Sequence, residues 1–230
     1  MKLISRFRTE LLDGCKTCYT LGAAFSKDKK SLALAHAGYF EDDNPPSFGA
    51  VTLWNIEDLN NPVKTFEYNL GENHLKDVAI LDPGDILTAN HNSLFKISVS
   101  GNTHIEIPFE PGPAFTGIER MCRMPDNRVA LAANGTIFLL ASDGEEILHE
   151  YERQSILSGL MSISVSPDCK FAAIATAEGQ IQINHLNNEQ ERISLKDPME
   201  NGQHHSFSSD GQLFAHGGGN SGAYTRDTTN

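Results

Sequence analysis

Two acidic residues, Asp77 and Glu119, stand 42 residues apart in this chain of 230 residues, each near the start of a segment that we expect to be a strand. Two carboxylates held at a defined separation can act as the acid and the base, or as the acid and the nucleophile, of glycoside hydrolysis. Lys76 and Arg120 are their neighbours in the sequence and can neutralise them. We therefore expect ion pairing at these positions, with catalysis as the alternative.

The longest irregular segment is GYFEDDNPPSFG, residues 38–49. Pro45 and Pro46 stiffen it, which reduces the entropy that is lost on docking. Aromatic anchors inside a charged rim are typical of protein-binding patches. We expect a partner-binding loop, with aromatics that pack on their own sheet as the alternative. The residues of the segment that we expect to contact the partner are Tyr39, Phe40, Glu41, Asp42, Asp43 and Phe48.

Side chains that bind metals are scattered along the chain. Cys15 and Cys18 form a single Cys-x-x-Cys pair, whereas a structural zinc site needs four ligands. The segment HGGG, residues 216–219, resembles a lipase oxyanion loop, but the chain has no Gly-x-Ser-x-Gly motif to accompany it. We expect no metal and no cofactor. No spacing places these histidines at one point: His36, His91, His204, His205 and His216.

The composition indicates an acidic protein, with 30 Asp and Glu against 18 Lys and Arg and a formal charge of −12. This charge repels a phosphate backbone, so we expect no nucleic-acid partner. It either keeps the protein soluble or attracts a basic protein partner. The first 25 residues carry charges throughout, and no transmembrane segment is evident. The four cysteines have no regular spacing, and we expect a cytoplasmic protein without membrane contact.

One phrase recurs five times along the chain. Pro83, Pro125 and Pro167 fall 42 residues apart, and Ser209 takes the next equivalent place. Each is part of a tight-turn signal between two apolar runs, because proline presets φ and aspartate bonds to its own backbone. In the first copy Asp28 stands 56 residues before Gly84, its expected counterpart, so this copy has about 14 additional residues.

Every copy has the same order of segments. An apolar strand is followed by the turn, an alanine-rich strand, a small-residue turn and a third strand, and the first four copies add a more polar fourth strand. Glycine at junctions such as ANGTIF is typical of hairpins. Four antiparallel strands in about 40 residues predict one blade of a propeller.

The stretch FSKDKKSLALAHAG, continued by GAVTLWNIED, resembles a WD repeat, with Trp54-Asn55 where that family has Trp-Asp. The other copies lack this dipeptide, and no Gly-His pair precedes any first strand. The resemblance covers essentially the whole chain and implies an all-β, WD-repeat-like β-propeller with degenerate repeats. In these repeats the family's buried Asp-His-Ser-Trp network cannot be assembled as usual.

We expect a single domain, residues 1–230, with five blades of four antiparallel strands. The repeats span about 21–71, 72–112, 113–155, 156–198 and 199–230, after a closing strand and lead-in in 1–20. The last copy lacks a fourth strand, and residues 3–11 can supply it and close the ring. An unclosed fragment covered by another chain is the alternative. The positions expected to face the central channel are Leu21, Asp77, Glu119, Met161 and Gln203, with Arg120 and His204 one place on.

These expectations favour a non-catalytic scaffold, a monomer by itself, that binds a macromolecular partner through one propeller face. In the family, the loop at 38–49 opens on the same face as the connections into the first strands. We therefore add to the partner-binding residues Asp77, Glu119, Arg120 and His204. Three alternatives stay open: an immunity protein that neutralises a basic toxin, a glycosidase-like enzyme, and a subunit whose sheet edge joins another protomer.

Overall fold

The computed structural model describes residues 15–40, 48–71, 74–107, 109, 117–133, 136–151, 160–176, 180–188, 191–196, 204–217 and 223–227. All regular elements in these ranges are β-strands, and they form five antiparallel sheets. The chain divides into two compact units, Met1–Phe109 and Glu110–Asn230, which are described separately.

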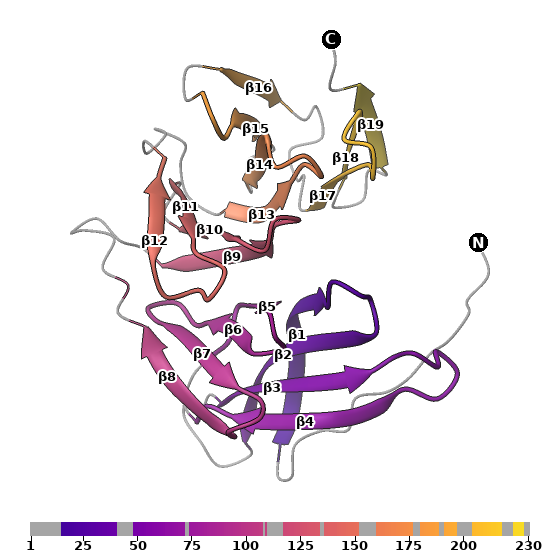
Figure 1. Ribbon diagram of the computed structural model, residues 1–230, viewed down its shortest axis with the longest axis vertical. Helices are drawn as coiled ribbons and strands as arrows, with labels where there is room; N and C mark the ends of the chain where they lie inside the picture. Colours follow the sequence, from indigo (N-terminus) through magenta and orange to yellow (C-terminus); the bar gives the residue numbers. More distant parts are fainter. Residues whose placement is uncertain are drawn as a thin grey trace. The chain divides into compact units, whose positions relative to one another are not determined.

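Unit 1 contains two four-stranded sheets whose strands lie in chain order (Figure 1). Sheet 1 consists of β1 (Cys15–Phe25), β2 (Ser31–Phe40), β3 (Phe48–Asn55) and β4 (Val63–Asn69). Sheet 2 consists of β5 (Asp77–Ile80), β6 (Ile86–Ala89), β7 (Leu94–Ser98) and β8 (Thr103–Ile107).

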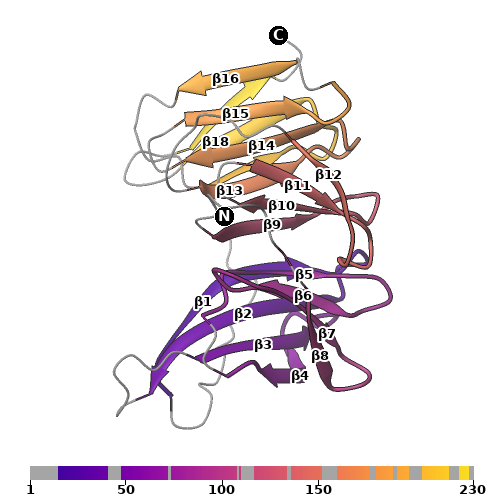
Figure 2. The same cartoon turned by 90° about the vertical axis from the view of Figure 1, so that its left-hand side faces the viewer.

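Unit 2 contains three sheets, again with strands in chain order (Figure 2). Sheet 3 consists of β9 (Ile118–Arg123), β10 (Val129–Ala133), β11 (Thr136–Leu140) and β12 (Ile147–Glu150). Sheet 4 consists of β13 (Leu160–Val165), β14 (Phe171–Thr176), β15 (Gln180–His185) and β16 (Arg192–Lys196). Sheet 5 has three strands in the described ranges: β17 (His204–Phe207), β18 (Leu213–Gly217) and β19 (Ala223–Asp227).

The second strand lies inside each sheet, and in sheets 1, 3 and 4 it is rich in alanines that are buried. Ala33 and Ala35 of β2 share a core with Val78 and Ile80 of β5, so sheets 1 and 2 pack face to face. In unit 2, one core joins sheets 3 and 4 and another joins sheets 4 and 5. Small side chains in the second strands allow this close stacking. The predicted order of segments within each repeat is confirmed.

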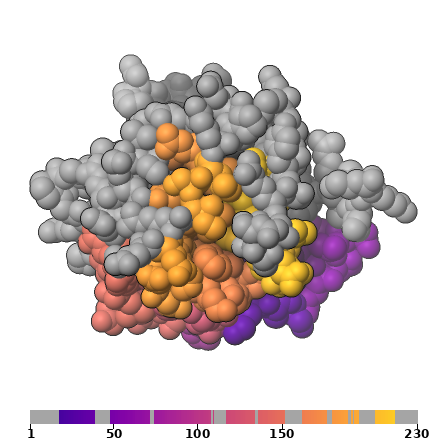
Figure 3. Space-filling view, turned by 90° about the horizontal axis from the view of Figure 1, so that it is seen from above, coloured from indigo at the N-terminus to yellow at the C-terminus, as the bar shows by residue number. Residues whose placement is uncertain are grey.

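The fourth strands are the more exposed strands of their sheets, in contrast to the buried second strands. Exposed large apolar side chains occur on all four of them, and Figure 3 shows part of sheet 4, in orange, at the surface. A strand that is half solvated reads as polar in the sequence. These exposed residues are Val63, Ile105, Ile147, Leu148 and Ile193.

The turns between the first and second strands share one closing hydrogen bond in all five sheets. The amide of its fourth residue donates to the carbonyl of its first residue at 2.8 to 3.0 Å. The fourth residue has a positive φ in each of them. The predicted tight turns are therefore confirmed. Their fourth residues are Lys29, Gly84, Asn127, Cys169 and Gly211.

The register of sheet 2 differs from the prediction by one residue. Pro125 and Pro167 occupy the second position of their turns, whereas Pro83 occupies the third. Gly84 is consequently the counterpart of Lys29, and Asp28 corresponds to Pro83. The constant 42-residue spacing of the prolines was misleading, because Pro83 follows a cis peptide bond at the third position of its turn, whereas Pro125 and Pro167 take the second position.

A β-bulge recurs in the first strand of sheets 1, 3 and 4, four residues before the last pair of that strand with the second strand. Leu21, Glu119 and Met161 are the additional residues that interrupt the pairing with the second strand. Counting three residues back from the last pair of each first strand therefore gives a different set from the predicted one. The residues that occupy this equivalent register position, each in its own sheet, are Gly22, Asp77, Arg120, Ser162 and His204.

The additional residues of the first repeat do not all lie in a loop. β2 continues through Phe40, and β3 begins at Phe48, which pairs with Gly38. β1 extends seven residues beyond Gly22, whereas β5 begins level with Gly22. The prediction of a loop over residues 38–49 is therefore wrong at both ends, because the three strands of sheet 1 are longer than their counterparts.

Candidate functional site

Asp77 lies at the first position of β5, against the backbone of β1. Its side chain is buried, and its Oδ1 accepts a hydrogen bond from the Val78 amide at 2.9 Å. A Cβ atom on Gly22 would lie 2.6 Å from the Asp77 Cα. Asp77 thus lies at a close approach of β1 and β5, and this position requires glycine on β1.

Glu119 and Arg120 lie on β9 in unit 2, and both are half-buried. The Arg120 guanidinium donates from Nη1 to the Glu119 carbonyl oxygen at 2.7 Å. Glu119 is the bulge residue, whereas Asp77 is level with Arg120. The expectation that Asp77 and Glu119 occupy equivalent positions is therefore wrong, because the bulge shifts the register of β9.

His204 begins β17 and pairs with Gly217, which places it level with Arg120. The predicted channel positions Leu21 and Met161 are bulge residues of β1 and β13, and Gln203 lies outside the described residues. The side chain of His204 is also outside the described part of the chain.

The aromatic and acidic segment is only partly described. Tyr39 and Phe40 belong to β2, and their side chains lie outside the described residues, as do Glu41, Asp42 and Asp43 entirely. Phe48 is only 1% exposed and packs with Ala50 and Cys18. Phe48 is therefore a core residue, and the prediction that it contacts a partner is wrong, because strand pairing begins at Phe48 itself.

Exposed apolar side chains occur on β1, beside this segment. Tyr19 is 52% exposed and pairs with Ala37, and Leu21, in the bulge, is 43% exposed. Phe25, at the other end of the strand, is exposed as well. The sequence analysis did not identify Tyr19. The available signal was the length of the first repeat, because β1 is longer than β5 and its first half extends past β5.

A chain of hydrogen-bonded side chains crosses sheet 1 beside this surface. Trp54 Nε1 donates to Thr52 Oγ1 at 3.0 Å, and His36 Nε2 lies 2.8 Å from the same oxygen. His36 Nδ1 lies 3.2 Å from Thr20 Oγ1. The sequence analysis did not find this relay, because its members other than Trp54 come from three different strands.

The electrostatics of the relay are dominated by burial. His36 is 3% exposed, and burial lowers the pKa of its imidazole below the ordinary value of 6.5. The carboxylate of Glu67 acts in the opposite direction, and the ammonium of Lys64 acts in the same direction as burial. Glu67 and Lys64 are paired at 2.6 Å on β4. We therefore expect a neutral His36 at neutral pH.

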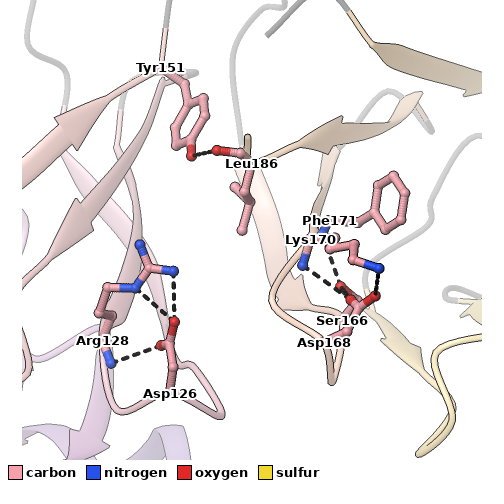
Figure 4. Close-up of polar contacts among 8 residues, drawn as sticks. All are labelled: Asp126, Arg128, Tyr151, Ser166, Asp168, Lys170, Phe171 and Leu186. Atoms are coloured by element: carbon pink, nitrogen blue, oxygen red, sulfur yellow. Dashed lines mark hydrogen bonds and ion pairs between the residues drawn. The ribbon is translucent and has the colours of Figure 1, made fainter. Parts of the chain in front are cut away.

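In unit 2, polar side chains connect sheet to sheet and stabilise the turns. The Tyr151 hydroxyl donates to the Leu186 carbonyl at 2.6 Å, which ties sheet 3 to sheet 4 (Figure 4). The Ser164 hydroxyl lies 3.2 Å from His205 Nδ1, between sheets 4 and 5. Figure 4 also shows the ion pair of Asp126 and Arg128 at 2.6 Å. These contacts are structural ties.

The described ranges contain neither a cluster of metal ligands nor a membrane-spanning helix. Among the described residues, no three His, Cys, Asp or Glu side chains are grouped so that they could hold a metal ion. Cys18 forms no disulfide with another described cysteine, and the side chain of Cys15 is not described. The described residues form no helix that is long and apolar enough to span a bilayer.

Sheets of antiparallel strands in chain order that pack face to face are the architecture of a β-propeller fold. Among solved structures, the fold is similar to the β-propeller domain of Cps50 (Swd1) from Myceliophteria thermophila, with a TM-score of 0.68 and 12% sequence identity. The match covers 91% of this chain and 69% of that chain. The sequence matches no protein-family model. It also matches no curated protein.

Proposed function

We propose that this protein is a non-catalytic interaction module that binds a protein partner at the extended end of sheet 1. The observation that carries the proposal is the exposure of Tyr19 and Leu21 on the part of β1 that extends beyond Gly22. Exposed aromatic and aliphatic side chains that are grouped on a rigid sheet are suitable anchors for a protein interface. The β-propeller fold supports a scaffold role of this kind.

The partner that we propose has a basic rim around an apolar contact. Glu41, Asp42 and Asp43 follow β2 directly in the sequence, and the chain carries a net charge of −12. Opposite charge at the rim accelerates association and makes it sensitive to salt. We propose a cytoplasmic protein that is monomeric by itself and has neither a nucleic-acid nor a membrane partner.

Affinity purification of the tagged protein from its native cell tests the binding surface. A variant with Tyr19→Ala and Leu21→Ala should lose the stoichiometric partner that the natural protein captures. The matched control is Ile147→Ala with Leu148→Ala, two exposed apolar residues on β12. A separate Tyr39→Ala, Phe40→Ala variant determines whether the neighbouring aromatics contribute. Full capture by the β1 variant would refute the proposed surface.

We propose no catalytic role for Asp77 and Glu119. They belong to different units and occupy different register positions, so the repeat does not present them as a matched pair. The purified protein should therefore release no chromophore from a panel of chromogenic glycosides. Hydrolysis that is lost in Asp77→Asn or Glu119→Gln would contradict this assignment.

We further propose that the five sheets are five blades of a ring that residues 3–11 close beside β19. Residues 1–14 lie outside the described part of the chain, and the support is the alternation of apolar and polar residues in LISRFRTEL. Deletion of residues 1–14 should lower the melting temperature by several degrees, whereas deletion of 228–230 should not. Light scattering should show a monomer. A dimer would favour closure by a second chain.

A further inference from the structure

We assign the hydrogen atoms of the relay in sheet 1 from the donors and acceptors that each group offers. An indole nitrogen can only donate, so Thr52 accepts from Trp54. The Thr52 hydroxyl then has its own hydrogen to donate, and His36 Nε2 is its partner at 2.8 Å. Nε2 therefore accepts, and the proton of neutral His36 resides on Nδ1, directed at Thr20 Oγ1. Each step of the relay depends on the one before it.

A second proton on His36 is incompatible with this order. An imidazolium donates from both nitrogens, so its Nε2 hydrogen would meet the hydrogen of the Thr52 hydroxyl. Thr52 would have to turn that hydrogen away while still accepting from Trp54. Thr52 is 5% exposed and His36 is 3% exposed, so water has little access to provide a substitute partner. Buried polar groups without partners are costly in such surroundings.

The charged groups that face the relay come from β4. Glu67 is opposite Thr52, and Lys64 is opposite Trp54. Their effects on His36 oppose each other, and burial lowers the pKa of His36 further than either of them shifts it. From β1 and β3, the described residues of the relay are the hydroxyls of Thr20 and Thr52 and the indole of Trp54, which carry no charge.

We propose that this relay makes sheet 1 an acid-sensitive element of the fold, in which protonation of His36 removes the acceptor of the Thr52 hydroxyl hydrogen and thereby alters the hydrogen bond of the Trp54 indole. The sign follows from linkage: the unfolded chain takes up this proton near 6.5, whereas the folded chain takes it up only at lower pH. The relay therefore makes its full contribution to stability above pH 6.5. This contribution is lost progressively as the pH falls toward the pKa of the folded protein.

A pH titration followed by NMR tests the proposal in the natural protein. Trp54 is the only tryptophan, so its indole N–H gives a single, unambiguous signal. The His36 ring signals and the indole signal should move together, with one midpoint below 6.5. An indole signal that stays in place while His36 takes up its proton would overturn the proposal, and this titration requires no variant.

The variant His36→Gln provides a second measurement. Glutamine offers one acceptor and a donor but does not titrate, so the indole signal should no longer respond to acid in this range. His74 is the control, because its pKa is also lowered, first by burial and then by Lys76, and it lies just before β5. His74→Asn should leave the indole titration unchanged. A response that persists in His36→Gln would refute the assignment to His36.

Discussion

At the scale of single residues, the packing of unit 1 leaves no space for a side chain at Gly22. Gly22 lies level with Asp77, and a Cβ atom there would come within 3.0 Å of the backbone of β5. Contacts this short cannot be relieved by turning a flexible side chain, because the obstacle is main chain. Glycine at this position is therefore a packing requirement between two neighbouring first strands.

Gly22→Ala should lower the free energy of unfolding by about 2 kcal/mol, a typical cost of overpacking. Chemical denaturation measures this change. Gly101→Ala is the matched control, because an added Cβ there would meet only the side chains of Ser98 and Thr103, at 3.3 Å. Equal effects of the two substitutions would show that the close approach of β1 and β5 does not determine the residue at position 22.

At the scale of an element, a serine and an aspartate hold three of the five turns together. In sheet 5, the Ser208 hydroxyl donates to Asp210 at 2.5 Å and accepts from the Leu213 amide at 2.9 Å. The turns that begin at Ser26 and Ser166 have the same pair of hydrogen bonds. The hydrogen bond from Ser208 is the main cause that lowers the pKa of Asp210. The turn therefore requires the charged carboxylate.

Ser208→Ala should destabilise the protein by about 1 kcal/mol, because one substitution removes both hydrogen bonds. The adjacent Ser209→Ala is the control, since Ser209 is exposed and surface substitutions usually change stability by less than about 0.5 kcal/mol. Thermal unfolding of both variants decides between them. Similar melting temperatures would mean that the backbone of the turn suffices without its side chains.

At the scale of the whole molecule, protection of the backbone should vary regularly across each sheet. The second strands β2, β6, β10 and β14 have a strand on both sides and buried side chains, whereas β4, β8, β12 and β16 end their sheets and carry exposed ones. Local opening costs least where burial is low. Hydrogen exchange should therefore be slowest in the second strands. Equally slow exchange in the fourth strands would contradict this pattern.

Much of this architecture could be predicted from the sequence, because the repeat combines two local signals. Alanine-rich strands mark the interior, and Asp126, Asp168 and Asp210 mark turns that their own side chains stabilise. Local chemistry of this kind needs no knowledge of distant residues. The strand order of the five sheets follows from it directly.

The candidate site could be predicted much less well. A bulge adds one residue without any marker in the sequence. The 42-residue spacing therefore predicts that Glu119 is equivalent to Asp77, whereas Arg120 occupies that register position. Phe48 resembled a loop aromatic until strand pairing showed that it is buried. Side-chain exposure depends on where a strand ends, and sequence patterns locate strand ends least reliably.

The bulges at Leu21, Glu119 and Met161 have a further consequence for how this protein can change over evolutionary time. Each one separates the alternation of side chains before it from the alternation that builds the core after it. Residues upstream can thus be replaced, and strands lengthened as in β1, without moving a single alanine of the second strands out of register. Mutations that create a new specificity and mutations that maintain the fold can therefore accumulate independently, on the same strand, one residue apart.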